Sequence, residues 1–261
     1  MKEKKVVIVT TTFYKDIGEL RFALACILVK EAVEAGHKIV IVDASPNPAI
    51  ATQLSYCGAH VFPQLHKGMG AGRRQAFFQA SEIANQCGIK YILWTEPEKE
   101  DLIRSVEKIV SPIRVNDVQI VVPRRSEQSW ESWPEFQVAS EKKANAVYNE
   151  AFGTNDIDPM FGPVAFSIDV ADYFIRCYTE RFGTDKEGKL NVADTYIQHF
   201  APQVAKKAGV GVKSVEIDMV YPPRQKAEEE QTTNNEIQAK RKWQLESLSA
   251  SYRTVAEYLQ L

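Results

Sequence analysis

The sequence predicts an α/β fold in which a mostly parallel central sheet is flanked by helices and followed by a C-terminal helix. Short apolar runs rich in Val, Ile and Thr alternate with longer segments of helical period. These runs are almost uninterrupted, which is typical of strands buried on both faces of a parallel sheet. Their alternation with helices favours right-handed strand–helix–strand crossovers.

The first part of the chain carries four such strands. The second of them ends at Asp43, before a proline-rich turn. Asp16 is the expected N-cap of the first helix, and Gly36 is a natural stop for it. We expect strands at residues 5–12, 38–42, 60–62 and 91–94, and helices at 16–35, at 50–56 and from the glycine-rich turn to about residue 87.

The second part of the chain has a less regular pattern. We expect a helix at 100–110, a strand at 119–122, a long functional loop at 126–134, a helix from about 140 to 152, strands at 161–166 and 215–219, helices opening at Asp169 and Asp194, and a polar, irregular segment up to Asn235. The last helix, at 236–259, carries an apolar stripe: Leu245, Leu248, Tyr252, Val255 and Leu259. This stripe either packs on the same chain or forms the seam of a homodimer.

Composition and charge narrow the possible functions. Of 261 residues, 44% are hydrophobic and 25% are charged, as in ordinary globular proteins. The net charge of -2 provides no general basic field for nucleic acid. No apolar run approaches the ~20 residues of a membrane span. The N-terminus lacks a signal-peptide pattern, and the four cysteines are widely spaced, so we expect a cytoplasmic protein with reduced thiols.

Two carboxylates follow the fourth strand directly. Glu96 and Glu98 flank Pro97, which cannot continue a central strand. Carboxylate oxygens are preferred ligands of Mg²⁺ and Mn²⁺, whose other positions are often taken by phosphate oxygens. The alternative is an acidic loop that favours the N-terminus of the next helix.

Other polar groups are expected at the same edge of the sheet. In parallel sheets the ligand binds outside the carboxyl ends of the strands. This edge would carry Thr11, Phe13 and Asp43 beside the two glutamates. It would also carry the glycine-rich turn His66-Lys67-Gly68-Met69-Gly70-Ala71-Gly72-Arg73-Arg74.

The glycine-rich turn suits an anion. Glycines allow close approach of the backbone, a helix N-terminus offers free N–H groups, and Arg73 adds charge. A dinucleotide-binding fingerprint would follow the first strand with a different glycine spacing, and the Gly-Lys-Ser/Thr ending of a P-loop is missing. The turn therefore indicates phosphate binding without a standard NAD or ATP motif.

Taken together, these parts resemble a GT-A glycosyltransferase of the family-2-like kind, loosely similar to mannosylglycerate-synthase-like transferases. The resemblance is best over residues 5–102. It implies that Thr11, Phe13 and Asp43 bind the nucleoside of a nucleotide sugar. Gly70-Ala71-Gly72-Arg73 matches the family's Gly-Ala-Ala-Arg pattern, and Glu96-Pro97-Glu98 occupies the Asp-x-Asp slot that holds a metal ion, Mg²⁺ or Mn²⁺, and the diphosphate.

The resemblance extends more loosely into the second half. Gly162, within Phe161-Gly162-Pro163-Val164-Ala165-Phe166, matches the acceptor-side segment, and Asp194 matches an acid that accepts the acceptor's proton. An N-cap role is the alternative for Asp194. Tyr221-Pro222 stands where relatives often carry a metal-binding histidine, so the metal would have one protein ligand fewer or would need Tyr221, a water or His199 in its place.

Three further residues have two interpretations each. Trp130 and Trp133 either stack on the acceptor sugar or anchor their loop. Arg224, after Pro222 and Pro223, either closes on the diphosphate as part of a lid or belongs to a simple exit loop.

The resemblance implies a metal-assisted transferase that moves a sugar from a nucleotide sugar to a small soluble acceptor. Residues 1–122 would form the nucleotide-sugar half, residues 123–235 the acceptor half of the same domain, and residues 236–261 the terminal helix. A nucleotidyltransferase is the nearest enzyme alternative, although its glycine-rich loop would follow the first strand. A non-catalytic GT-A-like nucleotide-binding or scaffold protein is the alternative from another class.

Overall fold

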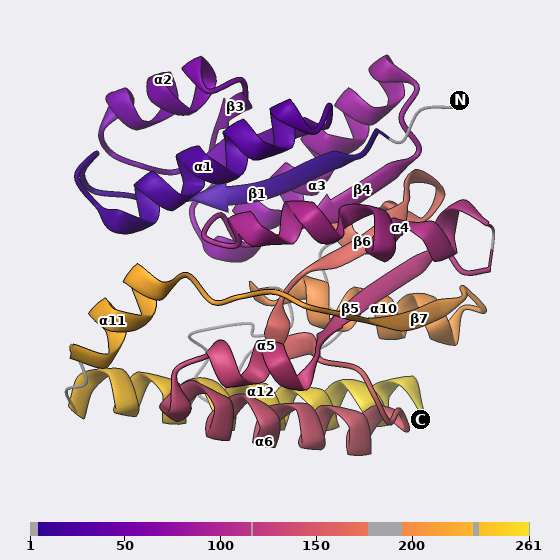
Figure 1. Ribbon diagram of the computed structural model, residues 1–261. Helices are drawn as coiled ribbons and strands as arrows, with labels where there is room; N and C mark the ends of the chain where they lie inside the picture. Colours follow the sequence, from indigo (N-terminus) through magenta and orange to yellow (C-terminus); the bar gives the residue numbers. More distant parts are fainter. Residues whose placement is uncertain (1–4, 116, 177–194, 232–234, 261) are drawn as a thin grey trace.

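The computed structural model describes residues 5–115, 117–176, 195–231 and 235–260, with side chains omitted for 235–241. A seven-stranded sheet runs through these residues in the order β3-β2-β1-β4-β6-β5-β7 (Figure 1). The strands are β1 (Val7–Thr12), β2 (Lys38–Asp43), β3 (His60–Pro63), β4 (Tyr91–Trp94), β5 (Ile120–Arg125), β6 (Val164–Ser167) and β7 (Val212–Ile217).

The prediction of a mostly parallel sheet is confirmed. Strands β1 to β4 pair in parallel with one another, and β5 pairs in parallel with β7. Strand β6 lies between these groups and is antiparallel to both β4 and β5. The register pairs Trp94 with Val164, so the segments beyond these two residues leave the sheet side by side.

Helices cover both faces of the sheet. In β1, Val7 and Val9 face one core, while Ile8 faces the other, as the two-residue period of a strand requires. Among the described helices, none has the length and apolarity to cross a membrane. The helices are α1 (Leu20–Glu34), α2 (Pro48–Tyr56), α3 (Met69–Cys87), α4 (Val106–Arg114), α5 (Glu127–Ser132), α6 (Glu135–Phe152), α7 (Asp172–Ile175), α10 (Ile197–Lys207), α11 (Pro223–Gln231) and α12 (Asn235–Leu259), with short 3₁₀ turns η1 (Glu100–Ser105), η2 (Pro159–Phe161) and η3 (Ile168–Val170).

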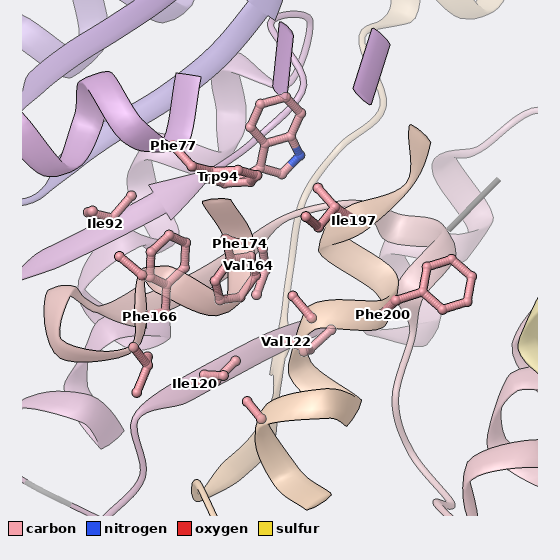
Figure 2. Packing of buried hydrophobic residues seen from close by; sticks show 14 of the residues in the cluster. Phe77, Ile92, Trp94, Ile120, Val122, Val164, Phe166, Phe174, Ile197 and Phe200 are labelled. Carbon is pink, nitrogen blue, oxygen red and sulfur yellow. The ribbon is translucent and has the colours of Figure 1, made fainter. Parts of the chain in front are cut away.

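Helix α3 lies close to the sheet because its buried face is made mostly of small residues. Ala76, Ala80 and Ala84 recur every four positions and are fully buried. Phe77 fills the space beside them, with its ring centroid 5.3 Å from that of Trp94 and 5.7 Å from that of Phe166 (Figure 2). This aromatic contact fixes the middle of α3 relative to the end of β4.

Several predicted boundaries are wrong for local reasons. The expected loop at 126–134 contains α5, because the Ser126 side chain accepts a hydrogen bond from the Ser129 N–H and caps a helix there. The expected irregular segment before Asn235 contains α11. The Asp16 carboxylate accepts a hydrogen bond from the Gly18 N–H instead of capping α1, which begins later, at Leu20.

The C-terminal helix α12 packs on its own chain. It lies beside α6 and contacts α10 (Figure 1). From its predicted stripe, Leu248, Tyr252, Val255 and Leu259 are buried in the same core as Phe77. The first alternative for the stripe is therefore the one in the structure, and these side chains are already covered within the monomer.

A buried ion cluster supports the segment before β6. The Arg125 guanidinium donates to Asp158 at 2.8 Å and to Glu141 at 2.6 Å, and its side chain is 0% exposed. Burial alone would raise the pKa of Asp158, but the hydrogen-bonded Arg125 lowers it below its ordinary value. The Trp130 ring covers the guanidinium at 3.5 Å.

Arg125→Met should destabilise the fold by about 3–5 kcal/mol, because it leaves two buried carboxylates without their cation. The neighbouring Arg124→Gln is a matched control. Arg124 makes partly exposed ion pairs with Asp156 and Glu216, so its loss should cost about 0–1 kcal/mol. Urea unfolding of the three proteins measures both values.

The Arg125–Asp158 ion pair should make the free energy of unfolding depend on pH, with a defined sign. Because the folded-state pKa of Asp158 is lowered, its stabilising contribution is complete above the unfolded value of about 3.9 and is lost as the pH falls through the folded value. The deficit of Arg125→Met should therefore shrink below about pH 4. A deficit that does not change with pH would contradict an electrostatic role for Arg125.

Candidate functional site

A cleft of about 740 Å³ opens at the carboxyl ends of the parallel strands. Its walls come from the end of β1, the residue after β2, the loop that enters α3, the start of α1 and the end of β4. The lining residues are Thr11, Thr12, Phe13, Tyr14, Arg21, Ala44, Gln64, Lys67, Gly68, Met69, Arg73, Trp94, Glu96, Pro97 and Glu98. We call this space the strand-end cleft.

The glycine-rich turn forms one wall of the strand-end cleft. Gly68 precedes α3 with a φ of 105°, which favours glycine, and its carbonyl accepts a 3.0 Å hydrogen bond from the Gln64 side chain. A Cβ on Gly72 would lie 2.6 Å from that same side chain. The glycines thus permit the loop to close tightly over the first turn of α3, whose N–H groups have no partners within the helix.

Arg73 is the buried cation of this cleft. Its guanidinium donates to the Thr195 carbonyl and, at 3.3 Å, to the Gln198 amide oxygen. It also lies between two aromatic rings, 5.4 Å from the centroid of Trp94 and 5.2 Å from that of Tyr196. Burial lowers the pKa of Arg73, while Glu96 opposes the shift, and an arginine remains charged at neutral pH.

Two buried donors in the lining lack a hydrogen-bond partner among the described residues. They are the Trp94 Nε1–H and the Arg73 Nε–H, on side chains only 1% and 8% exposed. Unsatisfied buried donors are uncommon in folded proteins and frequently mark functional sites. Both belong to the wall of the strand-end cleft.

Asp43 lies outside the lining of the cleft and holds two side chains at its edge. Its Oδ1 accepts hydrogen bonds from the Thr12 hydroxyl at 2.7 Å and from the Ser45 hydroxyl at 2.6 Å. The side chain is buried and is not part of the cleft lining, although the next residue, Ala44, is. The predicted contact of Asp43 with a nucleoside therefore stays a prediction.

The acidic pair lies in a tight turn after β4. The Lys99 N–H donates to the Glu96 carbonyl at 3.2 Å, and Pro97 occupies the second position of that turn, where its fixed φ is favourable. The Lys99 ammonium pairs with the Glu96 carboxylate at 2.7 Å and donates to the Phe161 carbonyl at 2.6 Å. Lys99 is a site residue that the sequence pattern did not reveal.

Glu98 faces a second unpredicted cation. Burial raises the pKa of Glu98, and the charge of Arg21 opposes that shift. Arg21 is also paired with Glu229 of α11 at 3.1 Å. Helix α1 thus supplies a cation to the acidic turn across the cleft.

Gly162 allows the Glu96 carboxylate to approach the backbone before β6. Its φ is 99°, and a Cβ at this position would lie 2.1 Å from Glu96 Oε1. The antiparallel register explains the meeting, because Glu96 and Gly162 are each two residues beyond the paired Trp94 and Val164. Glycine is therefore required here both by backbone conformation and by space.

A smaller cavity of about 210 Å³ lies on the other side of the acidic turn. We call it the inner cavity. It shares Arg21, Glu96 and Glu98 with the strand-end cleft. Its remaining lining residues are Lys99, Trp133, Gln137, Glu141, Met160, Gly162, Tyr196, Gln198, His199, Met219, Tyr221, Pro222, Gln225, Glu229 and Gln244.

The predicted site residues divide between these places. Thr11, Phe13, Arg73, Glu96 and Glu98 line the strand-end cleft, and Trp133 and Gly162 line the inner cavity. Gly70 is buried in the first turn of α3. Trp130 stacks on Arg125, Arg224 is exposed, and neither lines these cavities; Asp194 lies outside the described residues.

The acidic turn fits a divalent ion that is shared with a phosphate. Mg²⁺ is commonly held by one or two carboxylates together with substrate phosphates and waters. Glu96 and Glu98 supply such donors at the boundary of the two spaces, and Gly162, which has no Cβ, lets the Glu96 carboxylate lie against the backbone there. Within the described part of the chain, no three His, Cys, Asp or Glu side chains cluster to enclose a metal by themselves.

Gly162→Ala should destabilise the fold more than Gly209→Ala. Gly209 has a similar φ of 90°, but nothing lies within 4 Å of an added Cβ, so only the backbone strain of about 1–2 kcal/mol applies. At Gly162 the clash with Glu96 should add about 1–3 kcal/mol. Urea unfolding measures the difference, and equal losses would show that Glu96 is free to move away.

Comparisons with known proteins give a structural likeness only. No protein-family model matches the sequence, and neither does any curated protein. Glucosyl-3-phosphoglycerate synthase from Mycobacterium tuberculosis superimposes with a TM-score of 0.53 at 12% identity, over 95% of this chain and 79% of that one. The same enzyme in complex with Mn²⁺, UDP-glucose and phosphoglyceric acid gives 0.52 at 11% identity, over the same shares of both chains.

A nucleotidyltransferase also appears among the similar structures. CMP:2-keto-3-deoxy-manno-octonic acid synthetase, complexed with CTP, covers 88% of this chain and 99% of its own, but at a TM-score of 0.46 and 12% identity. We draw nothing from a likeness at that level. The resemblance seen in the sequence is confirmed at the level of the fold: the chain has a GT-A-like fold.

Proposed function

We propose that the protein is a glycosyltransferase that moves a sugar from a nucleotide sugar to a small acceptor, with Mg²⁺ or Mn²⁺ as cofactor. The observation that carries this proposal is the shared wall of the two spaces. Glu96, Glu98 and Arg21 line both the strand-end cleft and the inner cavity, so a donor on one side and an acceptor on the other would meet at the acidic turn.

The strand-end cleft would hold the nucleotide. Phe13 and Met69 are exposed apolar side chains of its lining that suit contact with a base. Thr11 and Asp43 would bind the nucleoside, while Gly70 at the start of α3 and Arg73 would bind the diphosphate. Lys67 and Arg21 add positive charge to the same lining.

Glu96 and Glu98 would hold the metal ion, which stabilises negative charge on the departing diphosphate when it is bound. Arg73 would add a positive charge that belongs to the chain itself. Lys99 keeps its hydrogen bond to the Phe161 carbonyl and so remains beside Glu96. These fixed charges act without reorganisation in a partly buried site.

The inner cavity would hold the acceptor. Gly162 and Trp133 belong to its wall, with the Trp133 ring 4.9 Å from that of Tyr221. In transfer, an acceptor hydroxyl oxygen bonds to the anomeric carbon as the bond from that carbon to the diphosphate oxygen breaks. Asp194 would take the hydroxyl proton in an inverting reaction. The described cysteines Cys26, Cys57 and Cys87 are free, in keeping with the cytoplasmic location that we propose.

Nucleotide binding should depend on Arg73. Arg73→Gln should weaken the binding of UDP or GDP at least tenfold, because a charged contact to the diphosphate is lost. Arg104→Gln is the control, since Arg104 is 78% exposed and lines neither space. Isothermal titration measures the affinity for the nucleotide. Arg73→Lys serves as a second variant: if it unfolds nearly like the wild type but binds the nucleotide more weakly, the loss of affinity comes from the lost contact and not from misfolding.

Metal dependence should reside in the acidic turn. In wild type, Mg²⁺ or Mn²⁺ should raise nucleotide affinity roughly tenfold or more, whereas Glu96→Gln with Glu98→Gln should abolish that increase. Glu127→Gln, an exposed glutamate on α5, should leave it intact. Metal-insensitive binding in wild type would contradict the metal site. Nucleotide binding without turnover of any nucleotide sugar would favour a scaffold role instead.

A further inference from the structure

We infer that Lys99 is an internal counter-ion of the acidic turn, which occupies the Glu96 carboxylate and keeps a divalent ion from binding tightly until a nucleotide is present. This inference rests on the proposed function, because it concerns how the same metal site is filled. The observation behind it is the ion pair between the Lys99 ammonium and Glu96 Oε2 at 2.7 Å. The chain thus supplies its own cation to a carboxylate that is proposed to hold the metal.

Lys99 is held beside Glu96 by contacts with two segments of the chain. Its ammonium donates to the Phe161 carbonyl at 2.6 Å and lies 5.4 Å from the centre of the Phe161 ring. Its backbone N–H donates to the Glu96 carbonyl at 3.2 Å, which closes the acidic turn. The Lys99 side chain is only 16% exposed, so the ion pair is less screened by water and salt than a pair on the open surface.

The Glu96 carboxylate has little room to turn away from this ammonium. It lies against the backbone of Gly162, where a Cβ would be 2.1 Å from Oε1 and 2.5 Å from Oε2. A divalent ion at Glu96 would therefore either displace the ammonium or lie close to it. Cations repel one another at such short range, most strongly where water is partly excluded. In both cases Lys99 lowers the affinity of Glu96 for the ion.

The second glutamate of the turn also faces a cation of the chain. The charge of Arg21 opposes the rise in the pKa of Glu98 that burial causes. The Arg21 guanidinium also pairs with Glu229 at 3.1 Å, so α1 and α11 hold it near the turn. Both glutamates that would bind the metal thus already interact with cations of the chain.

The two spaces together carry no excess of negative charge that would attract a divalent ion. Among their described lining residues, four carboxylates face four cations: Glu96, Glu98, Glu141 and Glu229 against Arg21, Lys67, Arg73 and Lys99. Glu141 is moreover paired with Arg125, which lines neither space. A nucleoside diphosphate brings negative charge and phosphate oxygens as further ligands. Ion and diphosphate should therefore bind together, and by linkage each raises the affinity for the other by the same factor.

Mn²⁺ binding to the full chain without nucleotide tests this inference. Free Mn²⁺ is measured by electron paramagnetic resonance in titrations of the wild type and its variants. Lys99→Met removes the ammonium, and Lys99→Gln removes it but keeps an amide donor that can serve the Phe161 carbonyl. Lys108→Met is the matched control, because Lys108 is an exposed residue of α4 that lines neither space.

We expect the wild type to bind Mn²⁺ weakly in the absence of nucleotide. Lys99→Met and Lys99→Gln should each bind it at least tenfold more tightly, because the Glu96 carboxylate has lost its competing cation. Lys108→Met should bind Mn²⁺ like the wild type. Adding Glu96→Gln to Lys99→Met should remove the gain, which would assign the bound ion to the acidic turn.

The inference is overturned if both Lys99 variants unfold in urea like the wild type but bind Mn²⁺ no more tightly, or if the gain survives Glu96→Gln. It is also overturned if the wild type binds Mn²⁺ equally well with and without UDP, after correction for the ion held by free UDP. A chain whose nucleotide affinity rises with metal, but whose Mn²⁺ affinity does not depend on Lys99, keeps the proposed function and loses this inference. A chain that binds no nucleotide loses the proposed function, whatever the Mn²⁺ titrations without nucleotide give.

Discussion

The site depends on the meeting of β4 with the antiparallel strand β6. Because Trp94 pairs with Val164, the two chain segments that leave the sheet beyond them run side by side, and Glu96 reaches Gly162. A parallel strand at this place would bring the segment that follows it to this edge, whereas the antiparallel β6 brings the segment that precedes it, with Gly162. With β6 antiparallel to β4, the acidic turn comes to line both the strand-end cleft and the inner cavity.

Buried charge keeps that approaching segment in place. Asp158 opens the 3₁₀ turn η2 that leads to Gly162, and it accepts hydrogen bonds from Arg125, Asn145 and the Phe161 N–H. Partners on three segments restrict the carboxylate to one position, which fixes where the Phe161 carbonyl lies. That carbonyl in turn holds Lys99 against Glu96. The position of the acidic turn thus depends on the buried ion cluster, although its cation, Arg125, lines neither space.

The sequence was informative where local pattern determines structure. Hydrophobic patterns located all seven strands of the described sheet to within a few residues, and strand ends located the cleft. The antiparallel direction of β6 was not predictable, because hydrophobic periodicity does not show in which direction a strand runs relative to its neighbours. Arg21, Lys99 and Glu229 were missed for a related reason: they come from a helix, a turn and a second helix, and only tertiary packing brings them to the acidic turn. Trp130 was ambiguous from sequence, and its stacking on Arg125 became visible only once α5 was placed.

The charges of the two spaces differ in a way that suits their proposed ligands. Among described lining residues, the strand-end cleft has three cations, Arg21, Lys67 and Arg73, against Glu96 and Glu98. The inner cavity has four glutamates, of which Glu141 is paired with Arg125, against Arg21 and Lys99. The cations of the strand-end cleft would attract a diphosphate. Since both spaces share the turn, the proposed function would place the phosphates of a nucleotide sugar in the cleft and its sugar towards the cavity. The carboxylates that would hold a metal for the donor also line the cavity proposed for the acceptor, so a change at Glu96 or Glu98 should affect both ligands.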